Sequence, residues 1–133
     1  MDINLQTGIK GESKVVVSEN NTAIAYGSGG VEVFATPAMI ALMENAALNS
    51  VEQFLPPGHT TVGINIQSSH LAATPVGMEV IARSELIRIE GKKLVFKVEA
   101  YDEKDKIGEG IHERFIIDRE KFMAKCEGKK QSG

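Results

Sequence analysis

The chain has 133 residues, of which 42% are hydrophobic and 25% charged, and its formal net charge at pH 7 is −3. This length and composition predict one soluble globular domain, and the dispersed basic residues and 5% aromatic content argue against a nucleic-acid-binding surface. The single cysteine, Cys126, excludes an intrachain disulfide. Without a leader pattern or an apolar run of about 20 residues, we expect a cytoplasmic protein that does not bind membranes.

The first elements are predicted to be two short strands or a hairpin. Residues 13–26 contain K-V-V-V and T-A-I-A-Y on either side of the turn S-E-N-N. The following G-S-G-G, residues 27–30, is expected to be a loop. It lacks the Gly-Lys-Ser/Thr sequence of a phosphate-binding loop, so we assign it no nucleotide.

One long helix is predicted over residues 36–55. Thr36 is a suitable N-cap, Pro37 fits the first helical position, and the sequence Pro-Pro-Gly at residues 56–58 ends the helix. The first half is apolar on most sides, which is typical of a helix inside a domain.

Glu44 is the unexpected residue of this helix. It shares one face with apolar residues, namely Ile40, Ala47, Leu48, Val51 and Leu55. A carboxylate on an apolar stripe is costly to bury without a partner. It is therefore either held there for chemistry, or it belongs to a half-buried helix and reaches water. The helix alone does not separate these two interpretations.

A run of antiparallel strands follows, predicted from alternating side chains at residues 61–72, 78–90, 93–101 and 107–118. Only the helix is large enough to cover the inner face of these strands. We therefore predict an α+β domain of the hotdog type, with an antiparallel sheet curled around one long central helix. Residues 1–125 would form this domain and residues 126–133 a flexible tail, and the open sheet edges favour a homodimer.

Several polar side chains could belong to a catalytic or binding site. His70 shares a strand face with Val62, Ile64 and Ile66, the face predicted to be buried, so it is either a hydrogen-bonded core residue or a partner for Glu44.

Thr36 either caps the helix or places the helix N-terminus near a developing oxyanion. Arg114 is an anion anchor or a solvated charge. His59 and His112 are expected to face solvent. The histidines have no ligand spacing, so we predict neither a metal site nor a cofactor.

Three segments of the chain carry a specific pattern of residues. They are F-A-T-P-A-M-I-A-L-M-E-N-A-A-L at residues 34–48, T-V-G-I-N-I-Q-S-S-H-L-A-A-T-P-V-G at residues 61–77 and I-G-E-G-I-H-E-R-F-I-I at residues 107–117. Together they resemble the fluoroacetyl-CoA thioesterase-like family of hotdog proteins, over residues 33–125.

This resemblance implies a thioesterase that hydrolyses an acyl-CoA, with Thr36, Glu44 and His70 as its catalytic set. It also implies that Gly63 lies near the thioester and that Arg114 lies near the bound substrate. One segment departs from the family pattern. Residues 27–33 lack the phenylalanines that form a lid in the fluoroacetate-selective enzyme. We therefore expect a short- or medium-chain acyl-CoA as the substrate.

Two other functions for a hotdog domain stay open at this point. An acyl-CoA hydratase or dehydratase would also use a histidine with a carboxylate. A non-catalytic acyl-CoA-binding module would bind without turnover, although it has no need for a buried carboxylate.

Overall fold

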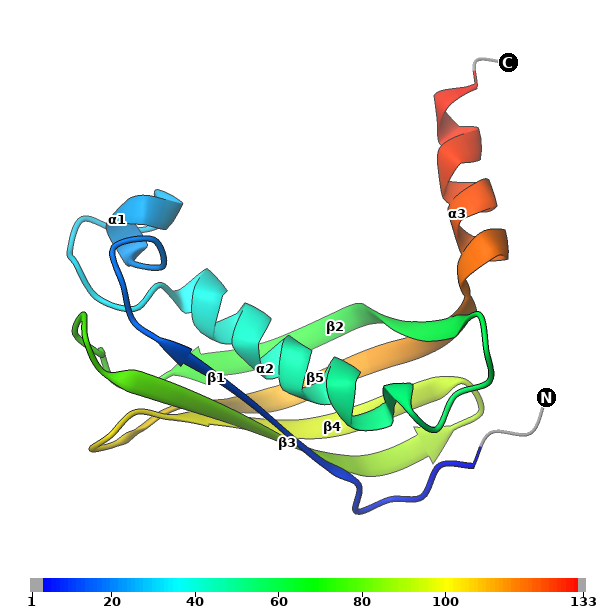
Figure 1. Ribbon diagram of the computed structural model, residues 1–133, viewed down its shortest axis with the longest axis horizontal. Coiled ribbons are helices and arrows are strands. Elements are labelled where there is room, and N and C mark those ends of the chain that lie inside the picture. The colour runs from blue at the N-terminus through cyan, green and yellow to red at the C-terminus, as the bar shows by residue number, and fades with distance from the viewer. Residues whose placement is uncertain (1–3, 132–133) are drawn as a thin grey trace.

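The computed structural model describes residues 4–131 and contains one antiparallel sheet of five strands in the order β1-β3-β4-β5-β2. Figure 1 shows this sheet beneath one long helix, α2, as predicted for a hotdog domain. The elements in chain order are β1 (Lys10–Val16), α1 (Ala23–Tyr26), α2 (Thr36–Glu52), β2 (His59–His70), β3 (Glu79–Glu90), β4 (Lys93–Tyr101), β5 (Lys106–Asp118), α3 (Arg119–Glu127) and the short 3-10 helix η1 (Gly128–Lys130). Strands β1 and β2 are the two edges of the sheet.

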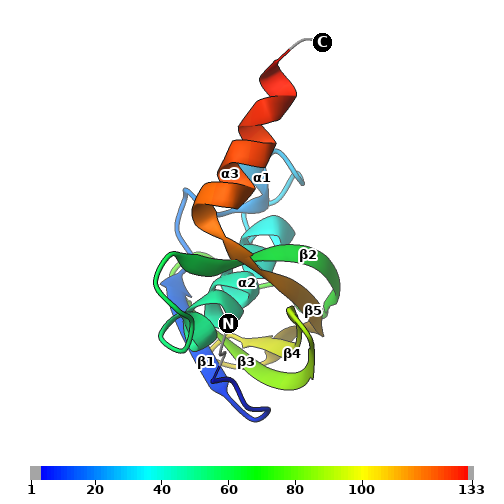
Figure 2. The same ribbon diagram turned by 90° about the vertical axis from the view of Figure 1, so that its right-hand side faces the viewer.

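The core lies between α2 and the concave face of the sheet, which Figure 2 shows end-on. Its largest fully buried side chains include Met39 and Met43 of α2, and Leu86, Leu94 and Phe96 of the sheet. Gly11 lies where β1 passes beneath α2, and a side chain there would collide with the backbone of Ala46. The helix can therefore approach the sheet closely at this point.

None of the helices within residues 4–131 has the length and apolarity of a bilayer-spanning segment.

An irregularity in β2 changes which of its side chains face the helix. Gly63 is paired with Arg114 and Asn65 with Glu113, so Ile64 is an extra residue in this strand. The prediction that Ile64 is buried is wrong, because its side chain is 51% exposed. Because of the extra residue, Gly63 and Ile66 both face α2 although they are three positions apart. His70 follows Ile66 at even spacing and keeps the predicted inward direction.

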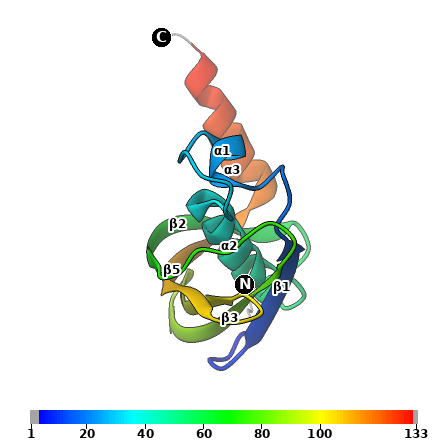
Figure 3. The same cartoon turned by 90° about the vertical axis from the view of Figure 1, so that its left-hand side faces the viewer.

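The N-terminal prediction of a second strand is wrong, because T-A-I-A-Y forms the short helix α1. The Thr22 hydroxyl accepts a hydrogen bond from the Ala25 N–H at 3.2 Å and caps this helix. Gly27 ends it in the left-handed conformation, with φ of 69°. Figure 3 shows α1 above the N-terminal end of α2.

Helix α2 also differs at its ends from the prediction. Its N-cap is Ala35, and Thr36 is the first helical residue, so the Thr36 hydroxyl does not cap the helix. The helix ends at Glu52, three residues before the predicted end. The tail predicted from residue 126 overlaps the end of α3 and η1, and residues 132 and 133 lie outside the described residues, as do residues 1–3.

Candidate active site

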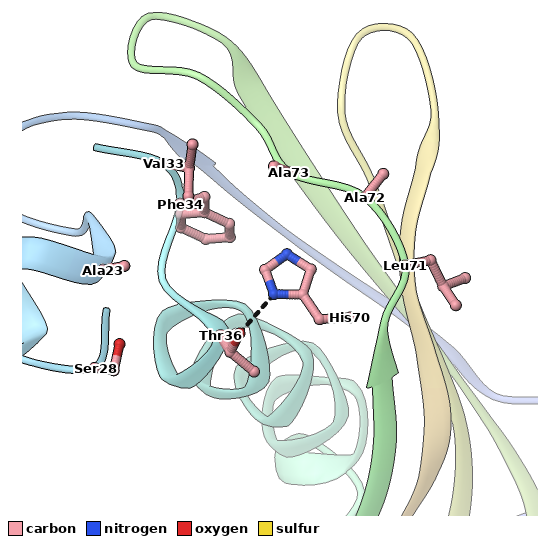
Figure 4. Close-up of a pocket in the computed structure, with 9 residues that line it drawn as sticks. All are labelled: Ala23, Ser28, Val33, Phe34, Thr36, His70, Leu71, Ala72 and Ala73. Carbon is pink, nitrogen blue, oxygen red and sulfur yellow. Dashed lines mark hydrogen bonds between the residues drawn. The ribbon is translucent and has the colours of Figure 1, made fainter. Parts of the chain in front are cut away.

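Two of the predicted catalytic residues meet at the N-terminus of α2. The Thr36 Oγ1 lies 2.7 Å from the His70 Nδ1 at the end of β2, as the dashed line in Figure 4 marks. Both side chains line an open pocket of about 370 Å³, with Phe34 beside them and Ser28 of the preceding loop across from them. This pocket is called the Thr36–His70 pocket below.

The ionisation of His70 is set by its surroundings. Burial lowers the pKa of the His70 imidazole below its usual 6.5, so the ring is neutral at pH 7 and can accept a proton. No described residue forms a hydrogen bond with its buried Nε2. A neutral imidazole with one nitrogen held by Thr36 and the other unpaired is suited to proton transfer.

The helix terminus adds a second feature to this pocket. No side chain caps α2 at Ala35, and its first turn contains no acidic residue. The N–H groups and the positive end of the helix dipole are therefore available beside Thr36. Such a terminus can stabilise negative charge that develops on a carbonyl oxygen.

Glu44 lies in a different pocket, together with Gly63, Thr61 and Arg114. Its side chain is 38% exposed, so the carboxylate is partly buried and still reaches solvent. Since α2 rises about 1.5 Å per residue, Glu44 lies about 12 Å further along the helix axis than Thr36. The structure brings Glu44, Gly63 and Arg114 together, and it brings Thr36 and His70 together, but it does not join the two groups within one chain.

Arg114 is held firmly beside Glu44. Its Nε donates to the Thr61 hydroxyl at 2.7 Å, its Nη2 donates to the Thr61 carbonyl at 2.8 Å, and its Nη1 donates to the His112 Nε2 at 3.1 Å. The guanidinium is therefore a fixed positive charge, and it is not the solvated sheet charge that was one of the two sequence interpretations.

The prediction that His112 faces solvent is wrong, because this residue is fully buried. It lies between Ile66 and Phe96 on the inner face of the sheet, and its Nδ1 donates to the Asn65 carbonyl at 2.9 Å. Its Nε2 then accepts from Arg114, which assigns the neutral tautomer. Burial also lowers the pKa of His112 below 6.5.

The positive charge next to Glu44 is therefore that of Arg114. His112 is neutral, although its Nε2 is only 3.9 Å from the Glu44 Oε2. The supporting role of His112 was not predicted from the sequence. The signal that could have found it was the shared strand face of His112, Arg114 and Ile116.

Gly63 leaves room for the Glu44 carboxylate. A Cβ at this position would lie 3.1 Å from the Glu44 Oε2 and 3.2 Å from the His112 Cε1. The absence of a side chain at Gly63 therefore makes room for the Glu44 carboxylate.

Within residues 4–131, no three His, Cys, Asp or Glu side chains are grouped in a way that could hold a metal ion.

Comparison with known proteins gives consistent matches. The family described as "FlK: Fluoroacetyl-CoA-specific thioesterase" matches residues 17–120. The fluoroacetyl-CoA thioesterase of Streptantibioticus cattleyicolor is 44% identical over 102 residues, which are 77% of this chain and 73% of that protein.

Solved structures agree with these matches. A point mutant of FlK in complex with acetyl-CoA has 35% identity and a TM-score of 0.90, and the match covers 96% of this chain and 100% of that chain. The Thermus thermophilus hypothetical protein TTHA0967, a thioesterase superfamily member, has 29% identity and a TM-score of 0.87, and this match covers 94% of this chain and 93% of that chain.

Proposed function

Because the chain belongs to the fluoroacetyl-CoA-specific thioesterase family and is a hotdog-fold thioesterase that hydrolyses acyl-CoA, we propose how its residues divide the reaction. The observation that carries the proposal is the Thr36–His70 hydrogen bond of 2.7 Å at the uncapped N-terminus of α2. The thioester carbonyl lies against this terminus, where the helix N–H groups stabilise its developing negative charge.

Glu44 supplies the carboxylate, either as nucleophile or as the base that activates water. In the second case the water oxygen bonds to the carbonyl carbon, the C–S bond breaks, and the water proton passes to the departing CoA thiolate. His70 orients the reacting group and relays this proton, and Thr36 fixes the imidazole. Gly63 admits the thioester close to Glu44, and Arg114 places a positive charge near both.

We further propose that the enzyme is a homodimer whose active site contains residues of both subunits. Strand β2 is an edge strand of 12 residues, and Ile64 on it is exposed. Two β2 strands pairing antiparallel about an axis between Ile66 and Gln67 would place Gly63 of the partner subunit opposite His70. Glu44 of the partner subunit, which lies beside that glycine, would then join Thr36 and His70.

The acyl chain and the compartment are also proposals. Residues 27–33 contain no aromatic side chain to narrow the entrance of the Thr36–His70 pocket. A short- or medium-chain acyl group therefore suits this pocket, without selection for fluorine. The exposed free thiol of Cys126 is compatible with the reducing cytoplasm, where we expect the enzyme to act.

Release of free thiol from acetyl-CoA through decanoyl-CoA, with fluoroacetyl-CoA included, tests the proposal in the wild type and in Glu44→Gln. We expect thiol release with a preference among the shorter chains, and its loss in the variant. Wild-type turnover in Glu44→Gln would refute the role of this carboxylate. Water addition to crotonyl-CoA without thiol release would indicate a hydratase, and a rise in Tm with CoA but no turnover would indicate a binding module.

A further inference from the structure

Helix α3 has almost no packing partner within its own subunit. It spans nine residues, Arg119–Glu127, and none of them is buried. Figures 1 and 2 show it leaving the end of β5 and projecting away from the sheet. A helix of this length is marginal in water unless a tertiary contact covers one of its faces. The chain alone therefore leaves α3 without the contact that such a helix needs.

One side of α3 is apolar. Cys126 is four residues after Phe122 and three after Met123, so its side chain neighbours both on the helix surface. The exposed fractions of Phe122 and Met123 are 40% and 48%, and Cys126 is also exposed. These three residues are called the α3 stripe below.

A second exposed apolar surface surrounds α1 at the other end of the molecule. Ile24 and Tyr26 of α1 and Val31 of the following loop are between 50% and 62% exposed. The same segment supplies Ala23 and Ser28 to the wall of the Thr36–His70 pocket, as Figure 4 shows. This surface, called the α1 surface, therefore borders the entrance of the candidate active site.

The two surfaces lie at opposite ends of the molecule, both on the side of the sheet that α2 covers. In Figure 1, α1 lies above one end of the β2 edge and α3 above the other end, and both project in the same direction. Figure 3 shows that α1 itself lies above the N-terminal end of α2, at the end of the molecule where β2 finishes at His70. A two-fold rotation that pairs two β2 edges exchanges these ends. It would bring α3 of each subunit to α1 of the other.

Charge favours the same pairing. Glu19 and Glu32 flank α1, and Lys121 and Lys125 lie on α3. Within residues 4–131, none of these four side chains takes part in a salt bridge. Glu120 is the one other charged residue of α3 that no salt bridge within residues 4–131 includes, so the unpaired charges of α3 are net positive. They complement the two glutamates beside α1, which favours a second copy of this chain as the occupant.

We propose that the α3 stripe of one subunit docks on the α1 surface of the partner subunit and covers the entrance of its Thr36–His70 pocket. This inference rests on the homodimer of the proposed function and adds the element that completes each pocket. The aromatic-free loop of residues 27–33 gives the pocket little apolar cover of its own. Helix α3 supplies apolar side chains from the other subunit and excludes water from the bound thioester.

Cysteine cross-linking tests this contact without relying on activity. Cys126 is the only cysteine, so Tyr26→Cys introduces a single second thiol on the α1 surface. Because Tyr26 is half exposed, this substitution is expected to leave the fold intact. A short bismaleimide should then give a covalent dimer on a denaturing gel. Tyr26→Cys combined with Cys126→Ser should give none, and neither should the wild type.

Lys104→Cys is the matched control, because it introduces an exposed thiol in the turn between β4 and β5, away from the β2 edge. Cross-linking that is no faster in Tyr26→Cys than in Lys104→Cys, in a sample that light scattering shows to be dimeric, would overturn the α3 contact alone. A monomer by light scattering would overturn both the homodimer and this inference.

Discussion

Replacing Gly63 by alanine adds a methyl group at the point where β2 approaches the Glu44 carboxylate. The new Cβ would lie 3.1 Å from the Glu44 Oε2, 3.2 Å from the His112 Cε1 and 3.5 Å from the Arg114 Nη1. His112 and Arg114 are buried and held by hydrogen bonds, so they cannot move away easily. Glu44 is 38% exposed and is the neighbour that can give way.

The expected effect on stability is small. Alanine in a strand gains about 0.5–1 kcal/mol over glycine through the smaller loss of backbone entropy. Crowding opposes this gain, and overpacking costs about 1–3 kcal/mol where no neighbour can move. Because the Glu44 side chain can turn toward solvent, we expect the free energy of unfolding to change by no more than about 1 kcal/mol, which is about 4 °C in Tm.

The expected effect on activity is larger. A reacting group misplaced by about 1 Å loses roughly 100-fold in rate, so we expect kcat for acyl-CoA hydrolysis to fall about 10- to 100-fold. Thiol release and thermal unfolding should be measured on the same samples. Gly128→Ala is the control, because a Cβ there meets nothing within 4 Å. Wild-type kcat in Gly63→Ala would refute the placement of Glu44 and Gly63 at the reacting bond.

Three further predictions follow from the same geometry. Thr36→Val removes the 2.7 Å contact to the His70 Nδ1. It should lower kcat at least about tenfold and leave Tm nearly unchanged. A pH–rate profile identical to that of the wild type would argue against positioning of His70 by Thr36. His112→Ala leaves a cavity and deprives Arg114 of an acceptor, so the free energy of unfolding in urea should fall by about 2–4 kcal/mol. A decrease below about 0.5 kcal/mol would contradict the buried role of His112. Burial lowers the pKa of both His70 and His112, so the unfolded chain binds protons more readily below pH 6.5. Stability is therefore complete above that pH and falls as the pH drops through the lowered values, and a urea midpoint that rose on acidification would refute this sign.

The architecture could be predicted because its main signals are long. Strands β3, β4 and β5 alternate over many residues, and the apolar residues of α2 identify it as the covering element. The short α1 could not be separated from a strand, because four residues show no clear period. Helix α3 gave no signal either, because its one short apolar stripe within nine residues is too brief to establish a helical period.

The errors at the site arise because side-chain alternation shows neither an extra residue in a strand nor which face of a strand is buried. Val62, Ile64 and Ile66 are all apolar, so the alternation of β2 hides the extra residue at Ile64 that changes the strand's register. His112 shares a strand face with Arg114 and Ile116, but alternation does not say which face is buried. The roles of Thr36, Glu44 and His70 came from the family resemblance, and they stay predictions. Helix geometry alone separates Glu44 from Thr36 by about 12 Å, which a single subunit does not bridge.

The most direct test of the two-subunit active site is activity in mixed dimers. Glu44→Gln and His70→Ala should each be inactive as homodimers. After the two variants are unfolded together, mixed and refolded, half of the dimers are expected to be mixed, and each mixed dimer should contain one site with both Glu44 and His70 intact. Thiol release should therefore recover to about a quarter of the wild-type rate. No recovery, in a sample in which mass spectrometry shows mixed dimers, would contradict the assignment of Glu44 and His70 to opposite subunits.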